Sequence, residues 1–273
     1  MEIKYLCTIW GMNQPTIEEK LKLIKQAGFD GVEMKAPEGK GERIHLKNLI
    51  NKTGLDIITQ VRAEGRSSLE QIESLNTALL NAVELEPLLV NIHCGKDYWT
   101  LEENLQVISA AQNIAKNLEL EITHEIHRAR ATFCTTSTME IIKSLPEIKF
   151  TADFSHWCCV HNSLLHDQKD IVNHVIERSC YIHARVGNAI TPQITDPRAP
   201  ECAKAVDAHI MWWKRIVKHN KNKKTELLPI CSEFGPPEYM TTLPFTNEPI
   251  ADQWEINCYM KDMFKEQIGS TVQ

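Results

Sequence analysis

Four residues of the kinds that bind divalent metals follow four strand-like runs in the second half of the chain. They are Glu125 after LEITH, Asp153 after KFTA, His183 after YI and Glu233 after LLPICS. The first two gaps, 28 and 30 residues, match one βα unit of a barrel of roughly 250 residues. Three carboxylates and a neutral imidazole suit Mn, Mg, Co, Zn or Fe better than a thiolate-selecting metal. The spacing therefore predicts one divalent ion held by all four residues.

Each of these residues also has an ordinary structural role. A Glu or Asp at the end of a strand is commonly the N-cap of the next helix or a solvated loop residue. His183 lies between the apolar Ile182 and Ala184 and fits a hydrogen-bonded core histidine. The prediction of a metal site depends on the repetition of ligand-type residues at four consecutive strand ends.

Strand-like and helix-like segments alternate along the whole chain. Strand-like runs cover 3–10, 31–34, 55–61, 88–94, 120–125, 148–153, 180–185 and 227–233, and helical patterns cover 16–28, 41–52, 67–86, 101–118, 135–144, 164–177, 201–219 and 251–266. Parallel strands need crossover connections, so this alternation predicts an α/β fold, a closed (β/α)8 TIM barrel spanning residues 1–273 as one domain. An open doubly wound sheet is the alternative, but no GxGxxG turn follows the first strand.

Composition and charge exclude several classes of function. A net charge of −6 and a pI near 6.0 disfavour a nucleic-acid partner, which a basic face would attract. No apolar stretch approaches the ~20 residues that span a bilayer. The nine cysteines include no CxxC pair, and we expect reduced thiols in a cytoplasmic protein. The sequence leaves open whether the protein forms a homo-oligomer.

The motifs around the four residues resemble those of a known superfamily. THEIHR, TADFSHW, YIHARVG and CSEFGPP are similar to the strand-end motifs of xylose-isomerase-like barrels. That superfamily contains sugar and sugar-phosphate isomerases, ketose 3-epimerases, inosose dehydratases and nucleases of the endonuclease IV type. The resemblance implies that Glu125, Asp153, His183 and Glu233 bind one metal ion, and that His156, three residues after the Asp, faces the substrate.

The resemblance also implies a mechanism. A divalent ion that chelates a sugar carbonyl and its neighbouring hydroxyl favours removal of the adjacent C–H proton through an enediolate. Glu125 and Glu233 would serve both as ligands and as the acid/base pair on the two faces of that carbon. A hydride-shift isomerase would carry a lysine near the fifth strand, and HEIHRAR has none. The segment also lacks the second acidic residue found in many ketose 3-epimerases.

Further residues are expected to contact the substrate. His93 and His127 would hydrogen-bond sugar hydroxyls or, alternatively, orient a metal ligand. Arg185 offers a planar fork for a carboxylate or phosphate. Trp10 and Glu33 close the first two strands, where they would supply an aromatic wall and a hydroxyl partner; packing at the rim is the alternative for Trp10.

The gap of 50 residues between His183 and Glu233 contains the proline-rich segment 187–200. We expect either a lid that covers the bound substrate, with Gln193 or Arg198 reaching inward, or a loop that packs against a partner subunit.

The predicted function is isomerisation or epimerisation of a small-molecule sugar or sugar derivative. A sugar or inosose dehydratase or lyase is the alternative with the same metal chemistry, and a non-catalytic carbohydrate-binding barrel is the alternative from another class. An endonuclease IV-type nuclease would need additional histidine ligands on strands three and four and an Asp-x-His pair near strand seven. The chain has Gln60 on strand three and His183-Ala184-Arg185 on strand seven, and both disfavour the nuclease.

Overall fold

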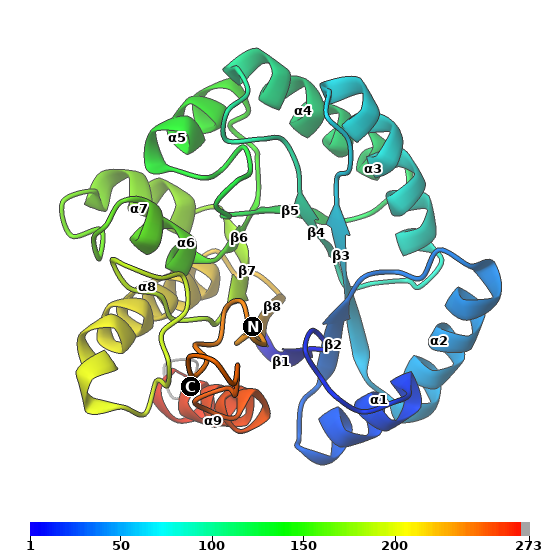
Figure 1. Cartoon of the computed structure of the whole chain (residues 1–273). Helices are drawn as coiled ribbons and strands as arrows, with labels where there is room; N and C mark the ends of the chain where they lie inside the picture. Colours follow the sequence, from blue (N-terminus) through cyan, green and yellow to red (C-terminus); the bar gives the residue numbers. More distant parts are fainter. Residues whose placement is uncertain (269–273) are drawn as a thin grey trace.

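The computed structural model describes residues 1–268, and their strands form a closed parallel barrel in chain order (Figure 1). The strands are β1 (Glu2–Thr8), β2 (Gly31–Met34), β3 (Asp56–Arg62), β4 (Val90–His93), β5 (Ile122–Glu125), β6 (Phe150–Ala152), β7 (Ser179–His183) and β8 (Leu227–Ser232). The barrel closes where β1 pairs with β8, in a register that runs from Glu2 with Leu227 to Cys7 with Ser232. The predicted (β/α)8 fold is confirmed.

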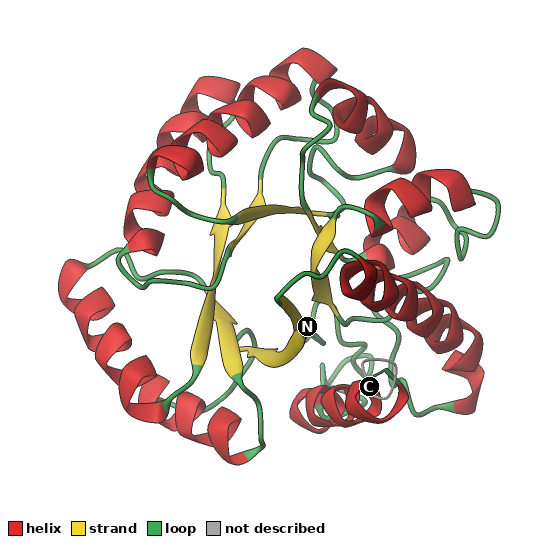
Figure 2. Cartoon of the chain, turned by 180° about the vertical axis from the view of Figure 1, so that it is seen from behind, coloured by secondary structure: helices red, strands yellow, loops and turns green. Residues whose placement is uncertain are grey.

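Helices surround the strands on the outside, as Figure 2 shows from the other side. They are α1 (Ile17–Gln26), α2 (Lys40–Thr53), α3 (Ser68–Val83), α4 (Leu101–Asn117), α5 (Thr135–Ser144), α6 (Phe154–Val160), α7 (Lys169–Ile176), α8 (Ala203–Asn222) and α9 (Gln253–Gln267), with a 3-10 turn at Pro200–Cys202. Three of them begin with a reciprocal capping box, at Thr16, Ser67 and Thr100. Each box satisfies two backbone N–H groups and fixes where the helix starts.

The short helix α6 is the element that the sequence did not predict. It begins directly after Asp153, whose side chain accepts a hydrogen bond from the Ser155 backbone N–H at 3.1 Å. The indole of Trp157 is buried and donates to the Thr132 carbonyl at 2.9 Å. Seven residues give too few turns for a periodic apolar pattern, so the sequence carries little signal for this helix. This helix places His156 beside Asp153 and Arg185.

Segment 187–200 is a packed connection. Gln193 is buried and its amide exchanges two hydrogen bonds with the backbone of Gly235, at 2.7 and 3.2 Å. Arg198 points away from the barrel mouth, pairs with Asp196 at 2.7 Å and lies over the ring of Tyr259 on α9. The guanidinium of Arg198 is therefore engaged by a neighbouring carboxylate, and the lid with Arg198 reaching inward stays a prediction. Gln193 does turn inward, but its side-chain amide forms its hydrogen bonds with the backbone of Gly235.

Among the described helices, none is both long and apolar enough to cross a membrane.

Buried His209 on α8 gives the fold a pH-dependent stability. It accepts a hydrogen bond from Gly187 N–H at 3.4 Å, and burial lowers its pKa to about 4. Because the unfolded value is near 6.5, the unfolded chain binds more protons between these two values, and stability falls as pH falls through this window. The unfolding free energy of the wild type should fall between pH 7 and pH 5, and His209→Gln should make this fall smaller by about 2 kcal/mol. Urea denaturation at both pH values measures it.

The matched control is His45→Gln on α2, because His45 is exposed. This variant should keep the wild-type difference between the two pH values. If His209→Gln kept it as well, burial of His209 would not be a source of the acid sensitivity.

Candidate functional site

The four predicted ligands meet at the carboxyl ends of β5 to β8. Glu125 and His183 are the last residues of their strands, while Asp153 and Glu233 directly follow theirs. All four are buried, with exposed fractions of at most 4%. One ligand atom from each lies within 4.8 Å of the corresponding atoms of the others. The barrel thus brings together residues that are 108 positions apart at the extremes, and the arrangement has the size of a single-ion site.

The polar atoms in this cluster approach one another without forming a complete set of hydrogen bonds. His183 Nδ1 lies 2.7 Å from Glu233 Oε2 and 3.4 Å from Glu125 Oε2. His183 Nδ1, Glu233 Oε2 and Glu125 Oε1 nevertheless lack a partner with hydrogen-bond geometry. Buried polar atoms without partners are costly. A divalent ion would give all three a ligand bond, so the donor set fits such an ion.

Glu33 on β2 supports His183 from the other side of the imidazole ring. Its Oε2 accepts a hydrogen bond from the Tyr181 hydroxyl at 2.8 Å and lies 3.0 Å from His183 Nε2. When Nε2–H donates to this carboxylate, Nδ1 keeps its lone pair for the cluster, which is how carboxylates orient metal-binding histidines. Glu33 is 1% exposed. Its partners in the structure are protein groups rather than the open space expected for contact with a sugar.

Arg185 lies between Asp153 and Glu233. Its Nη2 donates to Asp153 Oδ2, lies 3.4 Å from Glu233 Oε2 and contacts His156 Nε2 at 2.8 Å. The other Asp153 oxygen accepts from the Ser155 hydroxyl and backbone N–H. Burial raises the pKa of Asp153 to about 7, although the adjacent guanidinium opposes this rise. Both oxygens of Asp153 thus already accept from protein donors, with which a bound ion would share them.

The charges of this region do not balance within the protein. Glu33, Glu125, Asp153 and Glu233 are four buried carboxyl groups, and Arg185 is the permanent cation among them. Burial alone would lower the pKa of His183, but Glu233, Glu33 and Glu125 outweigh burial and raise it well above the usual range. The imidazole therefore binds a proton in the metal-free protein. Buried charges need compensation, and a divalent ion could replace this proton.

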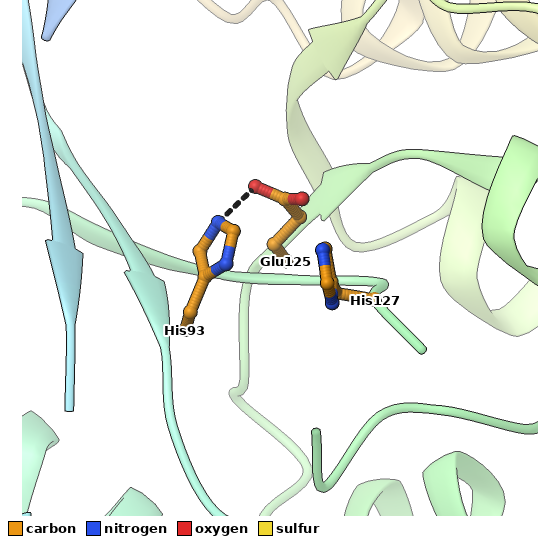
Figure 3. Close-up of side chains that lie close together, drawn as sticks. All are labelled: His93, Glu125 and His127. Atoms are coloured by element: carbon orange, nitrogen blue, oxygen red, sulfur yellow. Dashed lines mark hydrogen bonds and ion pairs between the residues drawn. The ribbon is translucent and has the colours of Figure 1, made fainter. Parts of the chain in front are cut away.

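Three histidines form a row beside Glu125. The rings of His93 and His127 have centroids 4.8 Å apart, and those of His127 and His156 lie 3.9 Å apart. His93 Nε2 contacts Glu125 Oε2 at 2.5 Å (Figure 3). Burial, together with nearby positive charge, lowers the pKa of His127 and of His156 well below the usual range. Both rings are therefore neutral at physiological pH, with nitrogen lone pairs available.

Asn91 and Tyr239 belong to the site but were not predicted as site residues from the sequence. Asn91 on β4 donates to Glu125 Oε2 at 2.5 Å and accepts from the Thr151 hydroxyl at 2.8 Å. The sequence did contain a signal for Asn91. It lies two positions before His93, and residues at this spacing share one face of a strand. Tyr239 follows β8 in an irregular loop, and no motif marks it.

Tyr239 covers the outer side of the cluster. Its ring centroid lies 4.8 Å from the guanidinium carbon of Arg185 and 5.1 Å from that of Arg128. Trp10 packs edge-on against the same ring at 5.1 Å. The indole also lies directly over Gly235, where an added Cβ would approach it to 2.3 Å. Trp10 thus lines an aromatic wall at the barrel rim, and its predicted contact with the substrate stays a prediction.

Solved structures of proteins with several different functions have the same architecture as this chain. A xylose isomerase-like TIM barrel protein from Mycobacterium smegmatis, in complex with magnesium, is 10% identical and covers 99% of this chain and 98% of its own, with a TM-score of 0.68. The chain has the xylose-isomerase-like TIM-barrel fold. A sugar phosphate isomerase/epimerase from Parabacteroides distasonis is 12% identical over 100% and 96% of the two chains, with a TM-score of 0.63. The probable 3-DHS dehydratase AsbF from Bacillus anthracis is 13% identical over 96% and 98%, also at 0.63.

Neither a protein-family model nor a curated protein matches the sequence. Endonuclease IV from Thermus thermophilus is also similar in structure, with 12% identity over 98% and 99% of the two chains and a TM-score of 0.61. The xylose-isomerase-like fold is thus shared by isomerases, a dehydratase and a nuclease. The residues of the site, rather than the fold, must decide the reaction.

The contact between Glu33 and His183 gives a direct test of the metal centre. We expect Glu33→Gln to weaken Mn²⁺ binding about 10- to 100-fold, because the amide is a poorer acceptor for Nε2–H and leaves Nδ1 less well directed. Isothermal titration calorimetry on metal-free protein measures the affinity. Glu38→Gln, an exposed substitution just after β2, should bind as the wild type does. Equal affinities for all three proteins would show that Glu33 does not orient the ligand.

Proposed function

We propose that this protein is a divalent-metal-dependent isomerase or epimerase of a sugar or sugar derivative. The observation that carries the proposal is the placement of two buried carboxylates, Glu125 at the end of β5 and Glu233 directly after β8, within 3.4 and 2.7 Å of His183 Nδ1. Asp153 completes the set. Together the four residues would hold one divalent ion from among Mn, Mg, Co, Zn and Fe. Bound there, the ion would polarise a substrate carbonyl and make the neighbouring C–H more acidic.

The two glutamates are suited to accept a proton. Burial raises the pKa of Glu125, but the charges of His93 and His183 outweigh burial and lower it well below the usual range. Burial likewise raises the pKa of Glu233, and Arg185 and His183 outweigh it. Both carboxylates are therefore ionised at neutral pH and able to act as bases. The one that takes a proton would become the acid that returns it, and an epimerase would need the two carboxylates on different faces of the substrate carbon.

The neighbouring residues would bind and shape the substrate. His156 and Arg185 lie side by side next to Asp153 and present polar groups to the same space. Tyr239 and Trp10 pack against each other and would form an aromatic wall on the outer side. The partner is thus a small polar molecule with a carbonyl beside a hydroxyl. His93 and His127 lie against Glu125, where they would also meet a group bound to that carboxylate.

A dehydratase is the second candidate. It is favoured by the structural similarity to a probable 3-DHS dehydratase and by the two guanidinium groups of Arg128 and Arg185 that face Tyr239. Paired guanidinium groups bind a carboxylate well. Elimination would use the same proton abstraction and differ in the group that leaves the neighbouring carbon. A product that has lost water, rather than an epimer or isomer, would identify it.

Deuterium exchange tests the proposed reaction. Manganese-loaded protein is incubated in D2O with free, phosphorylated and carboxylated sugars, and NMR follows exchange at the carbon beside the carbonyl. We expect exchange on at least one compound, and a fall of about 10²–10⁴-fold in both Glu125→Gln and Glu233→Gln, because each removes a proton-transfer group. Metal content is measured in every sample, so that loss of the ion is not mistaken for loss of a base.

Glu226→Gln is the control, because this exposed residue precedes β8 at the opposite end of the barrel. It should exchange at the wild-type rate. Wild-type exchange in both site variants would overturn the acid/base assignment of Glu125 and Glu233.

A further inference from the structure

A second group of metal-binding side chains adjoins the first and shares one residue with it. His93 at the end of β4, Glu125 at the end of β5 and His127 two residues later each offer a ligand atom, and these atoms all lie within 4.8 Å of one another. Figure 3 shows the Glu125 carboxylate between the two imidazole rings. The first cluster is rich in oxygen, whereas this one contains two imidazoles and one carboxylate. The two groups are therefore chemically different sites.

The local hydrogen bonds leave donor atoms free for a cation. His127 Nδ1 contacts the carbonyl oxygen of Arg128, which accepts only if Nδ1 carries the proton, so the lone pair of His127 is on Nε2. Glu125 Oε1 is buried and has no hydrogen-bond partner. His93 Nδ1 is likewise buried and unpartnered, while its Nε2 faces Glu125 Oε2. One proton now joins His93 to Glu125, and an ion bound between them would displace it.

We propose that His93, Glu125 and His127 bind a second divalent ion, with Glu125 bridging the two sites. This inference rests on the proposed function, because Glu125 is a ligand in both. Two imidazoles and a carboxylate favour Zn²⁺, Co²⁺ or Fe²⁺ over Mg²⁺ and Mn²⁺, whereas the three carboxylates of the first site accept the harder ions. Sites that share a carboxylate hold their ions roughly 3.5–4 Å apart, so that both can contact one substrate.

The charge of the region is compatible with two ions and indicates the kind of substrate. With all four buried carboxyl groups ionised and His183 neutral as a metal ligand, the Arg185 guanidinium leaves an excess of three negative charges. One divalent ion leaves a single negative charge, and two leave a single positive charge. With two ions bound, a hydroxide or an anionic group of the substrate would neutralise the remaining positive charge. Arg128, whose guanidinium lies over Tyr239 at the outer side, would favour the same anionic group.

Hydrogen bonding alone is the competing explanation for this cluster. His93 and Asn91 both contact Glu125 Oε2 at 2.5 Å and would hold the carboxylate in place without any metal. That explanation does not use His127, whose ring contacts are with His93 and His156. Substitution of His127 therefore separates the two explanations, since it leaves the contacts of Glu125 with His93 and Asn91 intact.

Metal stoichiometry tests the proposal on the full chain. Metal-free protein is titrated with Co²⁺ and separately with Mn²⁺, and bound metal is measured by elemental analysis after removal of free ions. We expect the wild type to bind two Co²⁺ per chain and one Mn²⁺. His127→Gln and His93→Gln should each bind one Co²⁺ and still bind one Mn²⁺. His166→Gln, an exposed histidine outside both groups of ligands, should retain two Co²⁺.

The outcomes separate this inference from the proposed function. One Co²⁺ in the wild type, with Mn²⁺ still bound, overturns the second site and leaves the first. No bound metal in the wild type overturns both. Two Co²⁺ retained in His127→Gln and His93→Gln overturns the assignment of the ligands. The cobalt absorption spectrum shows whether cysteines bind the ion, because thiolate ligands give charge-transfer bands that nitrogen and oxygen ligands do not, and circular dichroism checks that each variant is folded.

Discussion

The burial of negative charge at one end of the barrel is the constraint on which the rest of the site depends. Glu33, Glu125, Asp153 and Glu233 are all at most 4% exposed, and carboxylates are rarely buried without cations or hydrogen-bond donors. The surrounding polar groups answer this requirement: Tyr181 donates to Glu33, Asn91 to Glu125 and Ser155 to Asp153. These donors fix the direction of each carboxylate, but they do not cancel its charge. Arg185 and the protonated His183 offset part of this charge, and a bound divalent ion would offset more of it.

The fold was predictable from the sequence because its period is simple. Each βα unit returns the chain to the same end of the barrel after about 30 residues, so equal spacing of Glu125, Asp153 and His183 implies that they are neighbours. The 50-residue step to Glu233 breaks the spacing, yet the strand end still falls in place because the extra residues form a connection between β7 and α8, held by Gln193 on Gly235 and by Arg198 on Asp196. Helix α6 was not predictable, since seven residues cannot show a helical period.

The partners of individual side chains were harder to predict than their positions. Glu33 was correctly placed at a strand end, but its contacts with Tyr181 and His183 join residues about 150 positions apart and depend on how the barrel closes. His127 lies beyond the last residue of β5, where the alternation of strand faces no longer applies. Its ring still stacks between His93 and His156. Tyr239 depends on the path of an irregular loop, for which sequence patterns carry little information.

The way Tyr239 is held determines how a substrate reaches the cluster. The backbone of its turn is fixed, because Met240 is buried and its N–H donates to the Pro236 carbonyl at 2.8 Å. The ring itself is held by Trp10 and by the guanidinium groups of Arg128 and Arg185, contacts worth about 0.5–2 kcal/mol each. An anionic substrate can replace the ring at both guanidinium groups with stronger charged hydrogen bonds. For such a substrate, charged hydrogen bonds to the guanidinium groups would compensate for the lost aromatic contacts without unfolding of the turn.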